Sequence, residues 1–239
     1  MKQKIKIAVK KFPKVMALLS AQIILVLISF FISLSLLVIV IREIFYDKDY
    51  HMDERVFAYL KNFVTPANNN IMQFFSFGGS HLFLVPAWIL LIVFYYLKHK
   101  DGWMAFKMPF IALSTLLLMA GLKFFFNRSR PLIPLLKEVP GLSFPSGHAF
   151  MSFIFYGFVI YLVYNHVKSR RIKWLVISLL IIIILLIGLS RVYLRVHYAS
   201  DVIAGYCFGM MSLIILLWLL RRIEQYNEKV IPAAVNATE

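Results

Sequence analysis

Long apolar runs alternate with short polar segments along the whole chain. A helix needs roughly 20 mostly apolar residues to cross a bilayer, and six runs are close to or above that length. They cover residues 17–41, 80–97, 104–124, 148–167, 174–190 and 202–220. Pro145 precedes the fourth run and Asp201 the sixth, as is common where helices start. The pattern predicts an all-α fold, a polytopic membrane bundle of about six transmembrane helices.

The longest connection between these runs covers residues 42–79. Phe57, Leu60 and Phe63 recur there at helical spacing, and Pro66 then interrupts the pattern. We expect short helices that lie at the membrane interface.

Composition supports a membrane protein. The chain is 61% hydrophobic and 15% charged, whereas soluble domains are about 45–50% apolar and about 25% charged. Its 239 residues fit a single domain, 1–239. The net charge of +15 comes from short basic clusters between apolar runs, so we expect no nucleic-acid partner. The lone Cys207 forms no internal disulfide.

Lys and Arg are unevenly divided between the two sides of the predicted bundle. One side, which includes both termini, holds 16 of them and the other holds 10. Basic residues favour the cytoplasmic side, so we predict a cell-membrane protein with cytoplasmic termini and outward loops 125–147 and 191–201. The first run is too long for the core of a signal peptide and is interpreted as an uncleaved anchor.

Three polar blocks lie at the outer ends of predicted spans. Lys123 leads to Arg130 and Pro131 through Phe-Phe-Phe-Asn-Arg-Ser, Pro145 opens Pro-Ser-Gly-His, and Ser190-Arg191 leads to His197 and Asp201. Charged groups near membrane depth are costly and indicate function when they cluster. The three cations Lys123, Arg130 and Arg191 suit the oxygens of a phosphoryl group.

The histidines supply candidate reaction chemistry. His197 and Asp201 are four residues apart, so on a helix they would share a face, and the carboxylate would orient the imidazole as a nucleophile. His148 follows Ser146 and Gly147 at a helix start, where free backbone N–H groups bind anions. His148 would then protonate the leaving oxygen and later activate water.

These blocks resemble the signature of the type 2 phosphatidic acid phosphatase superfamily, which includes vanadium-dependent haloperoxidases and glucose-6-phosphatase. Its pattern is K-x6-RP, PSGH and SR-x5-H-x3-D, and every specified position matches. The resemblance implies a catalytic core at about 120–205 and a lipid phosphate phosphatase with a phosphohistidine intermediate. It also implies phosphatidylglycerophosphate, phosphatidate or undecaprenyl diphosphate as substrate. The implied catalytic residues are His197, His148 and Asp201, and the implied phosphate-binding residues are Lys123, Arg130, Ser146, Gly147 and Arg191.

Other interpretations differ in what the site does. One is a phosphatase specific for undecaprenyl diphosphate in cell-wall lipid recycling, and another is a haloperoxidase, since vanadate fits the same cradle. A non-catalytic phospholipid transporter would need the cations but not His197 with Asp201. We predict no metal cofactor, because the outer catalytic loops offer only the carboxylates Glu138 and Asp201. Arg128, Lys137 and Arg195 are interpreted as contacts to a headgroup or to a second phosphate, or as interfacial anchors.

Overall fold

The structure, a computed structural model, describes residues 2–99, 102–131, 133–135 and 140–236. These residues form helices and no strand, and six of the helices are long and apolar enough to cross a membrane. The predicted all-α bundle is therefore confirmed. The elements in order are α1 (Lys2–Ile41), the π-helical η1 (Arg42–Asp47), α2 (His51–Lys61), α3 (Pro66–Gly78), α4 (His81–His99), α5 (Gly102–Phe126), α6 (Gly147–His166), α7 (Arg170–Tyr193) and α8 (Ala199–Asn236).

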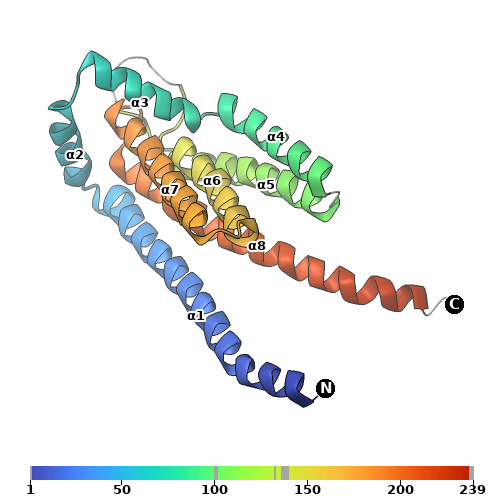
Figure 1. The fold of residues 1–239 in the computed structure, drawn as a ribbon. Coiled ribbons are helices and arrows are strands. Elements are labelled where there is room, and N and C mark those ends of the chain that lie inside the picture. The colour runs from blue at the N-terminus through green and yellow to red at the C-terminus, as the bar shows by residue number, and fades with distance from the viewer. Residues whose placement is uncertain (1, 100–101, 132, 136–139, 237–239) are drawn as a thin grey trace.

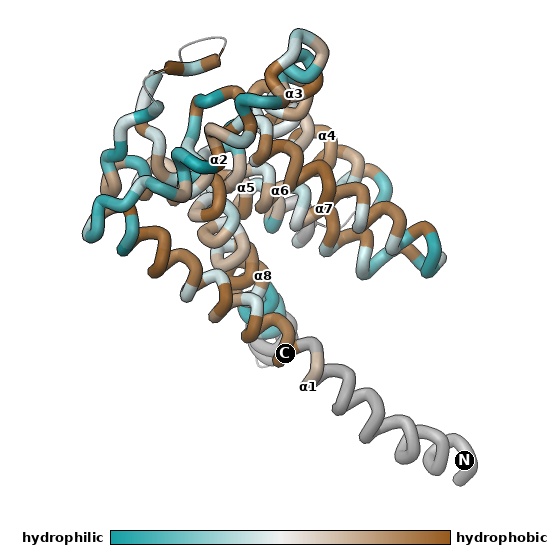
Figure 2. Tube along the Cα trace, turned by 90° about the vertical axis from the view of Figure 1, so that its left-hand side faces the viewer, coloured by the Kyte–Doolittle hydropathy of each residue, from teal (hydrophilic) through white to brown (hydrophobic). Residues whose placement is uncertain are grey.

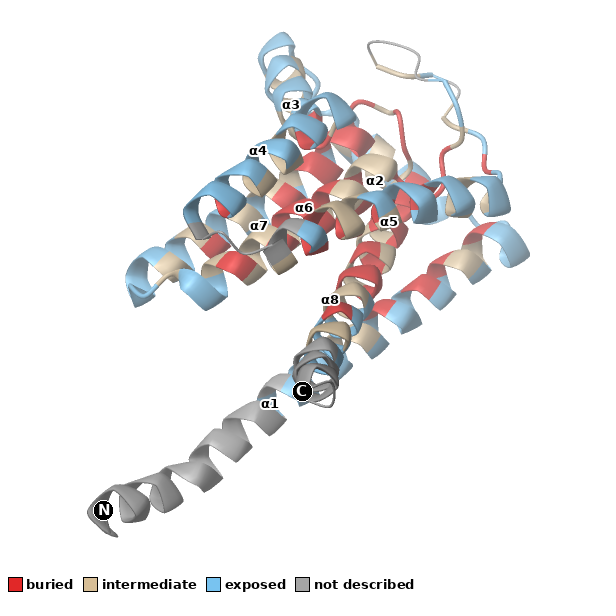
Figure 3. Cartoon of the chain, turned by 90° about the vertical axis from the view of Figure 1, so that its right-hand side faces the viewer, coloured by how far each residue is buried: buried red, intermediate tan, exposed pale blue. Residues whose placement is uncertain are grey.

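Helix α6 is the centre of the bundle. It packs between α7 and α8, while α1 lies along α8 and α4 lies along α5 (Figure 1). Buried residues gather on α6 and on the faces of α7 and α8 that meet it (Figure 3). The long helices are largely apolar where they are coloured (Figure 2), and many of their large hydrophobic side chains are exposed. A large exposed apolar surface around a polar-capped bundle is what a lipid environment requires.

Residues 42–79 gather at one end of the bundle. Helices α2 and α3 lie at this end and pack against α7 (Figure 1). Helix α3 starts at Pro66, with the Thr65 side chain accepting the Asn68 N–H at 3.1 Å, an ordinary N-cap. Short helices were predicted here and are confirmed, and the structure places them beside the three polar blocks.

Some helices extend beyond their apolar runs. Helix α7 begins at Arg170 rather than at 174, and α8 continues to Asn236 rather than ending at 220. Basic residues at the end of a span are good helix formers and extend their charged heads to water. An apolar run therefore marks the bilayer-crossing part of a helix and underestimates its length.

The opposite end of the bundle holds the start of α1 and the end of α8 (Figure 1). The described residues hold six candidate spans, and six crossings would leave both ends on the same side. The cytoplasmic location of that side stays a prediction from the basic residues.

A close contact between α8 and the start of α6 fixes the geometry of the polar end. A Cβ on Gly205 would lie 2.8 Å from the Ser146 carbonyl oxygen and 3.0 Å from the Ala149 Cβ. Only glycine allows the two backbones to approach this closely. The approach brings Asp201, one turn earlier on α8, against Ser146.

Candidate active site

Two cations come from the end of α5 and the connection that follows it. Asn127, with a φ of 45°, ends the helix directly after Phe126. The Lys123 Nζ donates to the Leu142 carbonyl at 2.6 Å. Arg130 donates from Nη1 to the Val196 carbonyl at 2.7 Å. Both cations are thus held by neutral carbonyl oxygens, which fix their position and leave their charge uncompensated.

The start of α6 supplies Ser146, Gly147 and His148. The Ser146 side chain caps the helix by accepting the Ala149 N–H at 3.5 Å. The Ser146 N–H donates to the Asp201 carbonyl at 3.0 Å. The expectation that this N–H is free for an anion is therefore wrong, because the close approach of α8 occupies it. No described residue accepts the Gly147 N–H, so this one stays open.

Arg191 lies in the last turn of α7 and is only 6% exposed. Its Nη1 donates to the Ser76 hydroxyl of α3. Its Nε has no hydrogen-bond partner among the described residues. A buried guanidinium N–H without a partner is costly, and a bound anion would remove that cost.

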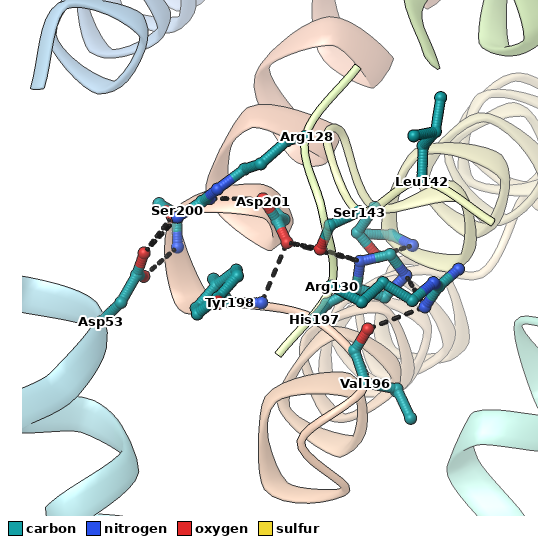
Figure 4. Close-up of polar contacts among 12 residues, drawn as sticks. Asp53, Arg128, Arg130, Leu142, Ser143, Val196, His197, Tyr198, Ser200 and Asp201 are labelled. Carbon is teal, nitrogen blue, oxygen red and sulfur yellow. Dashed lines mark hydrogen bonds and ion pairs between the residues drawn. The ribbon is translucent and has the colours of Figure 1, made fainter. Parts of the chain in front are cut away.

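His197 and Asp201 meet without the helical spacing that the sequence suggested. His197 lies in the bend between α7 and α8, and only Asp201 is on α8. The His197 Nδ1 lies 3.5 Å from Asp201 Oδ2 (Figure 4). The Tyr198 N–H donates to the same oxygen at 2.9 Å, and the Ser143 hydroxyl also donates to it. On the other side of the ring, Nε2 lies 3.3 Å from Arg130 Nη1.

Burial controls the protonation of this histidine. His197 is 1% exposed. Burial lowers its pKa to about 4, and the Asp201 carboxylate opposes that shift. At neutral pH the ring is therefore uncharged. Burial also lowers the pKa of Arg130, while Asp201 raises it. The guanidinium keeps its charge at neutral pH because the ordinary pKa of arginine is far above neutral.

Arg128 is neither a headgroup contact nor an interfacial anchor. It is 8% exposed, and its Nη1 lies 2.6 Å from Asp201 Oδ1 while its Nη2 lies 3.0 Å from Asp53 Oδ2. Of the other two residues grouped with it, Arg195 lies 6.0 Å from the ring centre of Phe57, and Lys137 is outside the described residues, as is Glu138.

Four polar residues that support the site are not predicted from the sequence, namely Asp53, Ser76, Ser143 and Ser200. One had a usable signal. Asp53 lies three and four residues before Val56 and Phe57 and seven before Leu60, so it falls on the apolar face of α2. A carboxylate on an apolar face indicates a buried ion pair.

All eight predicted site residues gather at one end of the bundle. The charges of Arg130, Arg191 and Asp201 act on His197, and His148 interacts electrostatically with His197 and Arg191. A Cβ on Gly147 would lie 3.8 Å from Lys123 Cε. In the described part of the chain, no three His, Cys, Asp or Glu residues form a metal-binding group. The arrangement is a cationic cradle around a neutral imidazole.

Comparison with known proteins places this arrangement in context. The sequence pattern of the PAP2 superfamily matches residues 104–225. Phosphatidylglycerophosphatase B of Bacillus subtilis (strain 168) is 29% identical over 170 residues, which are 69% of this chain and 81% of that protein. The bacitracin transport permease protein BcrC of Bacillus licheniformis is 30% identical over 101 residues, 38% of this chain and 45% of that protein.

Two solved structures are similar in fold. One is a transmembrane PAP2-type phosphatidylglycerolphosphate phosphatase from Bacillus subtilis, with a TM-score of 0.71 and 25% identity. The match covers 83% of this chain and 96% of that one. The other is Aquifex aeolicus LpxE, with a TM-score of 0.56 and 28% identity, covering 71% of this chain and 96% of that one.

Proposed function

Because this chain belongs to the PAP2 superfamily, we propose that it dephosphorylates membrane lipids through a phosphohistidine formed on His197. Family and relatives establish the coarser activity, a membrane-embedded phosphoric ester hydrolase of the lipid phosphatase type. One observation carries the finer proposal. The buried neutral ring turns Nδ1 toward Asp201 and Nε2 toward the cation Arg130.

The first step is attack by His197 on phosphorus. The Nδ1 atom lies 3.5 Å from Asp201 Oδ2. In the proposed mechanism Nδ1 carries the proton and Asp201 favours this tautomer, which leaves the Nε2 lone pair facing the cradle. The Lys123, Arg130 and Arg191 cations bind the phosphoryl oxygens and stabilise the charge that develops on them. The N–P bond forms as the bond from phosphorus to the lipid oxygen breaks. Asp201 then stabilises the positive charge on the ring.

His148 completes both steps as acid and then base. It protonates the departing lipid oxygen, a role favoured by the phosphate anion beside it. It then takes a proton from the water that attacks phosphorus. The N–P bond breaks, inorganic phosphate leaves, and His197 returns to its neutral form. The open Gly147 N–H adds a donor to the phosphoryl group at the start of α6.

Phosphatidylglycerophosphate is the substrate we propose first. The relative that covers most of this chain and the solved structure with the higher TM-score both carry that activity in their names. Phosphatidate and undecaprenyl diphosphate share the terminal phosphoryl group, and the cradle binds that group whatever the lipid. We propose that the reaction takes place on the outer face of the cell membrane, because basic residues favour the cytoplasmic side and are more numerous at the other end of the bundle.

Phosphate release from a lipid panel in detergent, with EDTA present, tests the activity. We expect hydrolysis of phosphatidylglycerophosphate by the wild type and none above background by His197→Ala. His51→Ala is the matched control, because that side chain is 80% exposed on α2. Loss of wild-type activity in EDTA, or full activity of His197→Ala, overturns the mechanism.

Trapping tests the intermediate directly. Rapid quenching with lipid labelled with ³²P in the phosphate should leave label on the wild type and on His51→Ala but not on His197→Ala. Hydrolysis that proceeds without any protein-bound label would contradict a covalent step.

A further inference from the structure

A second arginine of the same connection makes contacts of a different kind. The Arg128 guanidinium bridges two carboxylates on different helices, Asp201 at 2.6 Å and Asp53 at 3.0 Å (Figure 4). The exposed side-chain fractions are 8% for Arg128, 3% for Asp53 and 0% for Asp201. A guanidinium presents a rigid planar fork, so a bridge between two carboxylates fixes the direction of both.

The bridge assigns the two oxygens of Asp201 to different partners. Oδ1 receives Arg128, whereas Oδ2 faces His197 Nδ1 and accepts the Tyr198 N–H. The Tyr198 ring also covers the guanidinium, 4.1 Å from its central carbon. The Tyr198 N–H and the Ser143 hydroxyl hold Oδ2, and Arg128 holds Oδ1, so without Arg128 the carboxylate would lose the support on its second oxygen.

Asp53 also holds the first turn of α8. Its Oδ1 accepts the Ser200 N–H at 2.9 Å, and its Oδ2 accepts the Ser200 hydroxyl at 2.6 Å. A carboxylate at a helix N-terminus is favourable because of the exposed N–H groups there. The residue that follows Ser200 is Asp201, so α2 holds the backbone that carries the catalytic carboxylate.

The charges of the bridge also leave Asp201 with part of its negative charge unneutralised. Two carboxylates and one guanidinium sum to one negative charge. With Asp53 present, Arg128 does not fully neutralise Asp201, which keeps charge to stabilise a cationic His197 ring.

We propose that Asp53 and Arg128 form a positioning pair that orients Asp201 toward His197 and balances its charge, so that the active site requires helix α2 in place. This inference rests on the proposed phosphohistidine mechanism. Neither residue touches the substrate, and both act through Asp201.

Matched substitutions separate this pair from its surroundings. Asp53→Asn removes the charge and keeps the shape, and Arg128→Lys keeps the charge and loses the fork. Glu54→Gln and Arg55→Met are the controls, on neighbouring exposed positions of α2. We expect Asp53→Asn to lower kcat by about 100-fold with KM within about threefold, because misplaced catalytic groups cost about that much. Arg128→Lys should retain more activity than Arg128→Met, and both controls should stay within twofold of the wild type.

A double-substitution cycle tests whether the two residues act through one contact. The Asp53→Asn/Arg128→Met variant should lose no more than the worse single variant, because residues in one network are not additive. Losses that multiply would contradict a shared contact. If Arg128→Met does not fold, Asp53→Asn with Arg128→Lys gives the same cycle.

The pH profile of kcat/KM distinguishes positioning from support of the fold alone. Activity requires an ionised Asp201 and a neutral His197, so loss of a neighbouring cation moves the acid limb to higher pH and loss of an anion moves it to lower pH. Arg128→Met and Asp53→Asn should therefore shift it in opposite directions. The charged or titratable groups that face Asp201 and His197 are Arg128, Arg130, Lys123, Arg191, His148, Tyr198 and Asp53.

The outcomes are distinct from those of the proposed function. Full activity of His197→Ala would overturn the mechanism and this inference together. An inactive His197→Ala beside an Asp53→Asn variant with wild-type kcat and an unmoved acid limb would overturn the inference alone. A lower thermal midpoint with unchanged kcat would also overturn it, since α2 would then only stabilise the fold.

Discussion

Arg128 and Arg130 are two residues apart and have opposite environments. Arg128 lies between two buried carboxylates, and its charge is compensated within the protein. Arg130 donates to the carbonyls of Gly141 and Val196 and lies beside the His197 ring.

The difference lies in the acceptor rather than in the arginine. A cation held by carboxylates belongs to the framework, because its charge is already matched. Carbonyl oxygens fix the position of a cation but do not neutralise its charge, so a cation held only by carbonyls can still bind an anion. Lys123 and Arg130 are of the second kind, and Arg191, bound to a hydroxyl and with a free Nε, joins them. These three compose the cradle, and Arg128 supports it.

The largest effect is expected on stability, when Arg128 of the framework is replaced. Arg128→Met leaves Asp53 and Asp201 buried without a counter-charge, which should cost about 3–5 kcal/mol of the free energy of unfolding. Arg130→Met removes hydrogen bonds to two carbonyls and a contact with the neutral His197 ring, leaves no carboxylate unpaired, and should cost much less. Thermal unfolding in detergent, followed by tryptophan fluorescence, measures both. A larger loss for Arg130→Met would reverse the assignment of the two arginines.

The next largest effect is expected on catalysis, when Arg130 of the cradle is replaced. Arg130→Met should lower kcat/KM by about 100- to 1,000-fold, as loss of one preorganised donor to a developing charge does. Arg130→Lys should restore part of it, because a lysine supplies charge without the fork. Arg55→Met, on an exposed turn of α2, is the control for loss of a positive charge. Equal activity of Arg130→Met and the control would show that Arg130 is not needed.

The cradle residues were easier to predict from the sequence than the residues that support the site, such as Asp53. The cradle residues lie in short blocks with fixed spacing at span ends, so the positions of Lys123, Arg130 and Arg191 could be compared with a known pattern. Asp53 is 148 positions from Asp201, and no local pattern joins them. Their contact depends on how α2 packs over the start of α8, which is a tertiary property.

Local chemistry was harder to predict than proximity. The Ser146 N–H was expected to be free, yet Gly205 lets α8 approach until the Asp201 carbonyl accepts it. His197 and Asp201 were expected on one helix, yet a bend separates them and the carboxylate still reaches Nδ1. Spacing in a sequence identifies residues that meet, and the route by which they meet depends on backbone packing.

The lowered pKa of His197 predicts how stability and activity depend on pH. Burial lowers the pKa of His197 to about 4 in the folded chain, against about 6.5 in the unfolded chain. The unfolded chain therefore binds the proton first as pH falls, so this group's contribution to stability is present above pH 6.5 and is lost as pH falls toward 4. His197→Gln should remove this part of the pH dependence of unfolding.

The same pKa sets the pH dependence of activity. His197 should stay a neutral nucleophile down to about pH 4, and activity should fall about tenfold per pH unit below that. An acid limb of kcat/KM at pH 6.5 in the wild type would contradict a buried, neutral ring.

The smallest expected effect concerns an anion that occupies the cradle without reacting. Inorganic phosphate is the product and should bind the uncompensated cations of the folded protein only. At ten times its Kd it should raise the free energy of unfolding by about 1.4 kcal/mol. Arg130→Met should lose this stabilisation. Arg128→Lys should keep it, because the charge of Arg128 is already paired with Asp53 and Asp201 and does not bind the anion. Sodium chloride at the same ionic strength controls for screening. Phosphate stabilisation that survives Arg130→Met and disappears with Arg128→Lys would mean that the anion binds on the framework side, and the distinction between the two arginines would be wrong.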